Sequence, residues 1–147
     1  MTRPDPFYPL AGATNEPGTL TRGGPPIWLG GQRRRGIDLA ARNAQGWITP
    51  FLLPGGRTDR LAYFVELRGR LLARMAEIGR DPAGFEFAIQ VPTGAGGESR
   101  RDGLRLALDA ATAGATHIVL SMPAEVGAGG IGAVARELAM PLREALG

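Results

Sequence analysis

The 147-residue sequence has no cysteine, no lysine and a single histidine. Without cysteine the chain can form no disulfide, thiolate nucleophile or thiolate metal site. The lone His117 cannot form a histidine cluster for a metal, and no Ser/His/Asp set or close pair of carboxylates accompanies it at a strand end. The sequence therefore gives no support to nucleophilic, hydrolytic or metal-dependent catalysis, and it indicates no catalytic residue.

The chain also lacks a strong charge excess and a long apolar run. Its 17 arginines stand against 14 acids, which leaves a net charge of +3. The longest basic run, Arg33-Arg34-Arg35, has no interleaved aromatic residues of the kind that nucleic-acid binders use. No apolar stretch reaches the ~18 residues of a membrane helix, and the N-terminus lacks a signal-peptide pattern. We expect a cytoplasmic protein with neither a nucleic-acid nor a membrane partner.

Proline and glycine divide the chain into two parts. Residues 1–24 contain four prolines and four glycines and show no apolar periodicity, which is typical of an extended arm or linker. Residues 25–147 alternate short apolar runs with amphipathic segments and have the length for one ordinary core. We expect an arm at 1–24 and a single folded unit at 25–147.

Four apolar runs predict β-strands, at 27–29, 47–49, 85–91 and 116–122. The third has a clear period of two, with Phe85, Phe87, Ile89 and Val91 on one face. Four amphipathic segments predict helices, at 32–44, from a Thr58 or Asp59 cap to Gly79, from a Ser99 cap to Gly114, and from Ile131 onward with a kink or restart at Pro141. The predicted buried stripes are Ile37, Ala40, Ala41 and Ala44; Leu61, Phe64, Val65, Leu71, Leu72, Met75 and Ile78; Leu104, Ala107, Leu108 and Ala111; and Ile131, Val134, Ala135 and Leu138.

Four consecutive strand-helix units require a parallel sheet, because each parallel return needs a crossover helix. The chain falls well short of the roughly 250 residues of a complete (β/α)₈ barrel. On the residues alone, a small open α/β sheet and half of such a barrel are equally good interpretations of this (βα)₄ pattern.

The stretch PPIWLGG at residues 25–31 reads as a strand followed by a glycine turn and the start of a helix. Backbone N–H groups at such a turn point outward beside the positive end of the helix dipole, which suits a phosphate or another anion. A tight turn without a ligand is the plainer interpretation. His117 opens its predicted strand, which is the wrong end of a parallel sheet for ligand chemistry, and we expect it to be structural.

Two other glycine-rich segments are candidate ligand sites. Residues 127–132 fit G-x-G-x-x-G, but five residues separate them from the preceding strand and no βαβ unit follows, so a flexible loop is the better interpretation. The turn at 93–97 with Arg100-Arg101 is a second anion candidate, for which solvated charge is the better interpretation.

PPIWLGG followed by GIDLAARNAQGW resembles the luciferase-like (LLM-class) family of flavin- or F420-dependent oxidoreductases. The spacing from Ala40-Ala41-Arg42 to Gly46-Trp47 and the stretch GATHIVL at 114–120 resemble it too, and the likeness extends from residue 25 to about 146. Gln45 is a departure, because the family usually has Asp before Gly-Trp. The resemblance implies the C-terminal half of a TIM (β/α)₈ barrel, its fifth to eighth strands.

The resemblance also implies an F420 or FMN cofactor whose phosphate contacts Leu29, Gly30, Gly31 and Gln32, and hydride exchange between its ring and an organic substrate. In the family the first half of the barrel supplies much of the substrate pocket and the acid/base residues. We therefore expect a truncated chain that is inactive alone and is completed by a homodimer partner or a complementing N-terminal half-barrel. The alternative is a non-catalytic α/β interaction or subunit module on the same scaffold.

Overall fold

The computed structural model describes residues 2, 4, 6–14, 16, 18–20, 23–94 and 97–147, without the Glu98 side chain. Four parallel strands form one sheet in the order β1-β2-β3-β4. The strands are β1 (Trp28–Gly30), β2 (Gly46–Ile48), β3 (Glu86–Pro92) and β4 (His117–Ser121). The helices are α1 (Arg34–Asn43), α2 (Arg60–Glu77), α3 (Gly97–Thr112), α4 (Gly127–Val134) and α5 (Met140–Leu146), with a π-helical segment, Ala135–Ala139, between the last two and 3-10 turns at Pro54–Gly56 and Ala124–Val126.

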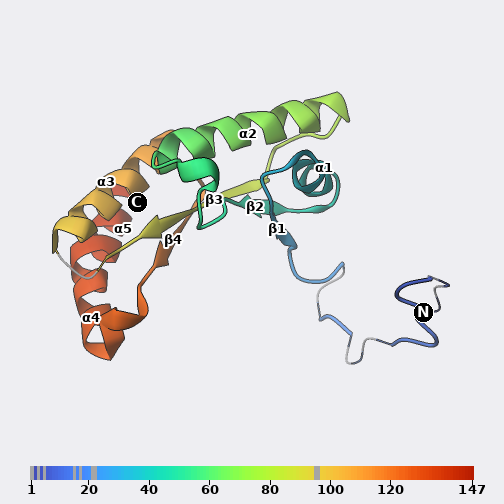
Figure 1. The fold of residues 1–147 in the computed structure, drawn as a ribbon, viewed down its shortest axis with the longest axis horizontal. Coiled ribbons are helices and arrows are strands. Elements are labelled where there is room, and N and C mark those ends of the chain that lie inside the picture. The colour runs from blue at the N-terminus through green and yellow to red at the C-terminus, as the bar shows by residue number, and fades with distance from the viewer. Residues whose placement is uncertain are drawn as a thin grey trace.

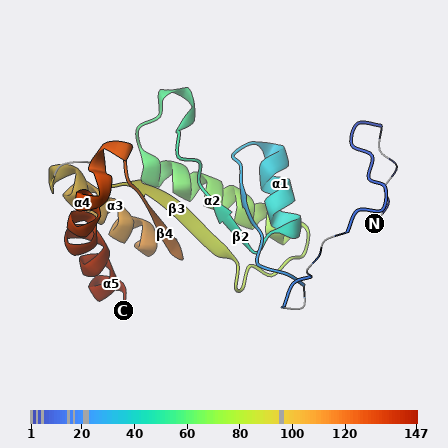
Figure 2. The same ribbon diagram turned by 90° about the horizontal axis from the view of Figure 1, so that it is seen from below.

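The helices cover one face of the sheet. In Figure 1, α1, α2 and α3 lie above the strands, and in the view from below the strands lie in front of α2 and α3 (Figure 2). Among the described elements no helix covers the opposite face, which is the open face of the sheet. Sequential parallel strands with their helices on one side are the arrangement of consecutive βα units in a barrel wall. The predicted α/β fold of four βα units is confirmed.

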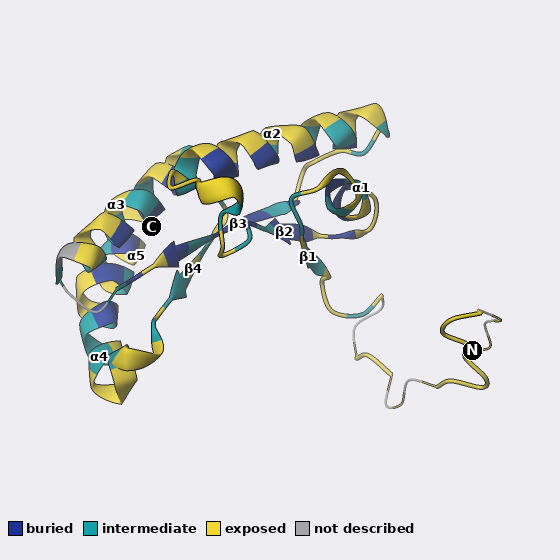
Figure 3. Cartoon of the chain, in the orientation of Figure 1, coloured by how far each residue is buried: buried dark blue, intermediate teal, exposed yellow. Residues whose placement is uncertain are grey.

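The core lies between the sheet and its helices, where the buried surfaces of Figure 3 face one another. Trp47 of β2 stacks on Phe64 of α2 with ring centroids 6.5 Å apart, and both side chains are fully buried. α1 approaches closely because its inward stripe is small: Ala40, Ala41 and Ala44 are fully buried, as predicted. Phe85, Phe87, Ile89 and Val91 are all buried on the helix side of β3, which confirms the period-two pattern.

The predicted stripe of α2 is wrong at one position. Val65 is 48% exposed, whereas Tyr63 and Leu67, which the prediction omitted, are buried. Val65 follows Phe64 directly and is therefore rotated about 100° away from it, while Leu67 lies close to the same face. The predicted cap is confirmed, because the Asp59 carboxylate accepts a hydrogen bond of 2.8 Å from the Ala62 amide.

Two further predictions fail in the second half. α3 begins at Gly97, so Ser99 lies within its first turn and is not its cap; residues 95 and 96, in the predicted turn 93–97, lie outside the described residues. Residues 127–132, predicted to be a flexible loop, are helical in α4. Gly130 suits this helix because an added Cβ would lie 2.3 Å from Val126 Cγ1, so the glycine leaves room for that side chain.

The last helix does restart near Pro141. α5 begins at Met140 and carries Pro141 in its first turn, directly after the π-helical segment. Proline has no N–H to donate to the carbonyl four residues earlier, so the regular ladder is interrupted there. Val134 and Leu138 are buried as predicted, but Ile131 is exposed. At the other end of the chain, the described residues up to Gly23 are exposed and lie apart from the sheet (Figure 1).

Candidate functional site

The turn after β1 is held tightly against α1. Gly31 has a φ of 138°, which side chains rarely adopt, and a Cβ added to it would lie 3.2 Å from the Gly36 Cα. The Gly31 carbonyl accepts a hydrogen bond of 2.9 Å from the Trp47 indole N–H. These contacts require glycine at position 31 for structural reasons alone. The close approach also brings the amino end of α1 directly onto the carboxyl end of β1.

The predicted site residues, Leu29, Gly30, Gly31 and Gln32, differ in how accessible they are to a ligand. Leu29 packs against the core, so its side chain is turned away from the open face. Gly30 is exposed, and a Cβ added there would meet nothing closer than Ile48, at 3.9 Å. Gln32 turns toward α2, where its Oε1 accepts a hydrogen bond from the Tyr63 hydroxyl. The backbone around Gly30 is therefore the part of this turn that a ligand can approach.

Positive charge gathers where α1 begins. Its N-cap is Arg33, whose side chain makes no capping bond, and no acid lies in the first turn. Arg33, Arg34 and Arg35 are all exposed there. The first amides of a helix have no intrahelical partner and form the positive end of its dipole. Three arginines at that end repel the dipole, so an anion beside the turn would relieve an unfavourable arrangement.

A second group of polar side chains lies on the open face, near the carboxyl ends of β2, β3 and β4. Gln90 Nε2 donates to the Thr49 carbonyl at 3.0 Å, and the Ser121 hydroxyl donates to Gln90 Oε1 at 3.4 Å. Sequence reasoning missed Gln90. The available signal was a polar residue on the third predicted strand, on the face opposite its apolar side chains.

In the second anion candidate, Arg100 is already paired with a carboxylate. Arg100 Nε lies 2.7 Å from Glu137 Oε2, and the Arg100 side chain is 13% exposed. Its hydrogen bond holds the pKa of the Glu137 carboxyl below its usual value. Arg100 therefore joins α3 to the π-helical segment, a partner from distant sequence that local spacing could not reveal.

His117 lies at the amino ends of the strands, as predicted, whereas the glycine turn and Gln90 lie toward their carboxyl ends. It is the first residue of β4, and its ring contacts Trp28 of β1 on the open face. Within the part of the chain that the structure describes, no three His, Asp or Glu side chains are placed to hold a metal ion. Nor does any helix among those residues combine the length and hydropathy needed to cross a membrane.

The model of the luciferase-like monooxygenase family matches residues 5–130 of this sequence. The chain belongs to that family. A comparison with curated protein sequences finds no match. Luciferase-like proteins are oxidoreductases that typically bind a flavin or F420.

The turn after β1 fits the phosphate of such a cofactor on three counts that come from this structure. The backbone at Gly30 is exposed, the first turn of α1 lacks a side-chain cap, and arginines flank it. In parallel α/β folds ligands bind at the carboxyl ends of the strands, where this turn lies. In a luciferase-like domain, these features make the β1–α1 turn the best candidate for a cofactor contact.

Proposed function

We propose that this chain supplies the cofactor-phosphate-binding part of a cytoplasmic F420- or FMN-dependent oxidoreductase, as the fifth to eighth βα units of a TIM barrel. The observation that carries the proposal is the uncapped, arginine-flanked start of α1 directly after Gly30 and Gly31. Membership of the luciferase-like family adds the class of cofactor.

In this proposal the backbone of the turn, its flanking side chains and the open face of the sheet contribute in different ways. The backbone of Leu29, Gly30 and Gly31 approaches the phosphate, and the amides of the first turn of α1 donate to it. Gln32 is positioned by its hydrogen bond to Tyr63. Arg33, Arg34 and Arg35 raise the local positive potential without needing a fixed geometry. Gln90 and Ser121 present donors and acceptors for a ligand on the open face.

A bound flavin or F420 would exchange a hydride with an organic substrate, and this chain would bind and orient it. Hydride transfer needs donor and acceptor held within about 3–3.5 Å with water excluded. The open face of the four-stranded sheet cannot exclude water by itself. We therefore expect no turnover by the isolated chain, and we expect a second copy or a complementing N-terminal half-barrel to be required.

Charge at position 30 gives the sharpest test. Gly31 is unsuitable, because any side chain there is strained and crowds Gly36. Gly30→Asp and Gly30→Asn place side chains of equal size in open space and differ in charge. We expect Gly30→Asp to weaken FMN or F420 binding, measured by fluorescence titration, by about 1–2 kcal/mol more than Gly30→Asn. Equal affinity of the two variants, or equal affinity of the parent for riboflavin and FMN, would place the phosphate elsewhere.

The second candidate is a non-catalytic interaction or subunit module. The observation in its favour is exposed apolar surface at the last strand of the sheet, at Val119 and Met122. Titration separates the two functions, because such a module would bind neither FMN nor F420 at concentrations where the first proposal requires saturation.

A further inference from the structure

Arg60 occupies an apolar position of α2. It is the first residue of this helix and lies four residues before Phe64, seven before Leu67 and eleven before Leu71, all of them fully buried. This spacing places Arg60 on the face of α2 that points toward the sheet. Because α2 follows β2, its first turn lies at the carboxyl ends of the strands. Arg60 therefore continues the buried stripe into the region where the barrel mouth would be.

The Arg60 guanidinium is partly removed from water and forms no ion pair among the described residues. Its Nη1 atom is buried and has no hydrogen-bond partner among the described residues. The nearest acids along the chain are engaged elsewhere: Asp59 caps α2 through the Ala62 amide, and Glu66 lies 2.6 Å from Arg57 Nη1. The guanidinium lies 5.4 Å from the centre of the Phe51 ring, a contact that offers the buried Nη1 group no oxygen or nitrogen acceptor.

The pKa of Arg60 is shifted in the direction expected from this environment. Removal from water lowers the pKa of its guanidinium, because burial disfavours the charged form. Arg57 and Arg74 show the opposite direction, because hydrogen bonds to carboxylates raise the pKa of each. The opposite pKa shifts agree with the geometry. Arg57 and Arg74 have carboxylate partners, and Arg60 has none among the described residues.

We propose that Arg60 is the receptor for an oxyanion group, a carboxylate or a phosphate, on the ligand that occupies the mouth. The planar fork of a guanidinium matches the two oxygens of such a group, and the amino end of α2 adds favourable potential. The inference rests on the proposed function for the presence of a ligand at the mouth, and it goes further by requiring that ligand to be anionic at a second place. The anion comes either from the cofactor phosphate or from an acidic substrate.

Arg68 provides a matched control within the same helix. Its Nε is also buried without a partner among the described residues. It lies over the Phe87 ring at 4.9 Å, and a Cβ added to Gly114 would lie 2.8 Å from its Cζ. Arg68 thus fills space between β3 and the end of α3, and its contacts explain its presence without a ligand.

The first experiment uses inorganic phosphate and acetate on the whole chain, at constant ionic strength. We expect the Arg60 Nε–Hε NMR signal to shift saturably with at least one of the two anions, while the signal of exposed Arg105 does not. In Arg60→Met the anion-induced increase in Tm should be lost, and the ligand-free Tm should rise because an unpaired, partly buried charge is removed. Arg68→Met should keep the anion response and lower the Tm.

The inference is overturned if no anion shifts the Arg60 signal saturably, or if Arg60→Met behaves as Arg68→Met does. A second titration, with FMN and riboflavin, identifies the source of the oxyanion. A loss in Arg60→Met of the parent's preference for FMN over riboflavin assigns the group to the cofactor, and an unchanged preference assigns it to the substrate. If neither FMN nor F420 binds while the Arg60 response persists, the proposed function fails and the oxyanion site stands.

Discussion

The indole of Trp28 on β1 meets the imidazole of His117 on β4 edge to face, with ring centroids 4.7 Å apart and ring planes at 87°. Strands three places apart in a flat sheet are separated by about 14 Å. The two rings can touch because both project onto the open face and the Trp28 ring extends across Gly46 of β2 toward β4.

Gly46 makes this contact possible, because the Trp28 ring lies across it. A Cβ at position 46 would lie 2.6 Å from Trp28 Nε1. We expect Gly46→Ala to lower the free energy of unfolding by about 1–3 kcal/mol, through displacement of a rigid ring. Urea denaturation measures this change. Adding Trp28→Leu to the Gly46→Ala variant should recover most of the lost stability, because the ring that clashes is removed. Gly69→Ala in α2, where an added Cβ meets nothing within 4 Å, is the control and should stabilise the protein by about 0.5–1 kcal/mol.

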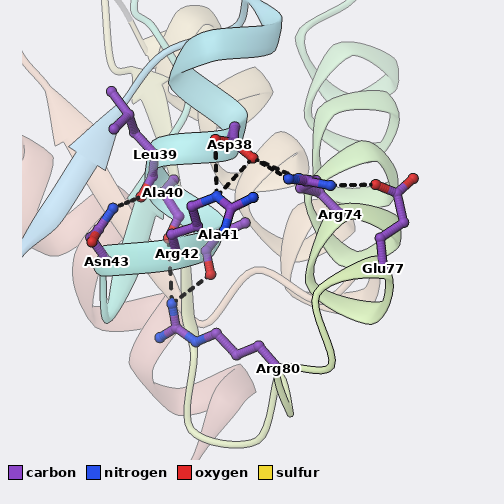
Figure 4. Close-up of polar contacts among 9 residues, drawn as sticks. All are labelled: Asp38, Leu39, Ala40, Ala41, Arg42, Asn43, Arg74, Glu77 and Arg80. Atoms are coloured by element: carbon purple, nitrogen blue, oxygen red, sulfur yellow. Dashed lines mark hydrogen bonds and ion pairs between the residues drawn. The ribbon is translucent and has the colours of Figure 1, made fainter.

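Arg80 ties the end of α1 to the segment after α2 (Figure 4). Its guanidinium donates to the Ala41 carbonyl at 2.8 Å and to the Ala44 carbonyl at 2.5 Å. Both carbonyls belong to the negative end of the α1 dipole, where a cation is favourable. We expect Arg80→Ala to lower the free energy of unfolding by about 1–2 kcal/mol. Arg105 has an exposed side chain on α3, and Arg105→Ala should change the free energy of unfolding by less than about 0.5 kcal/mol. Equal losses in the two variants would contradict a specific role for Arg80.

Acid should destabilise the fold through two carboxylates. Hydrogen bonds from Arg74 and Arg42 hold the pKa of Asp38 below its ordinary value of 3.8, as Figure 4 illustrates, and Arg100 holds the pKa of Glu137 below 4.5. A depressed pKa in the folded state contributes stability above the unfolded value, which is lost as the pH falls through the folded value. We expect Tm to fall as the pH drops from about 5 toward 2.

The variants Asp38→Asn and Glu137→Gln remove these titrations. Each should have a lower Tm at pH 7 than the parent and a flatter dependence of Tm on pH below about 5. Both carboxylates are partly solvated, so added salt should reduce the effect. A slope in the double variant equal to that of the parent would assign the acid sensitivity to other groups.

The two outer strands should promote association. β1 and β4 each have one side without a strand partner among the described residues, and Val119 and Ile27 are exposed there. Unpaired parallel edges with apolar side chains are templates for another chain. We expect light scattering to report a dimer or larger species at tens of micromolar, and Val119→Lys to shift it toward monomer. Val65→Lys on the outer side of α2 should leave it unchanged; a monomeric parent would indicate a self-contained α/β domain.

Much of the local structure was predictable because it depends on neighbours in the chain. The Asp59 cap, the largely alanine stripe of α1, the period of two in β3 and the restart at Pro141 all follow from backbone geometry and side-chain spacing. The glycine turn after β1 was predictable for the same reason, as was the family, since its motifs are contiguous. Element bounds shifted by one or two residues because helix and strand ends are set by pairing as well as by sequence.

Only the tertiary structure determined which charged and aromatic side chains have partners, and which residues supply those partners. Arg100 lies beside Glu137, and Trp28 beside His117, across 37 and 89 positions of sequence, distances over which no local pattern carries information. The sequence did not distinguish Arg60 from other charged residues at helix starts, whereas in the structure its buried, unpartnered Nη1 distinguishes it from Arg57, which pairs with Glu66. The sequence determined which segments become strands and helices through short-range sterics and periodicity. Packing determined which charged groups lose contact with water, because burial depends on side chains from distant parts of the sequence, and this burial is the basis of the oxyanion site that we propose.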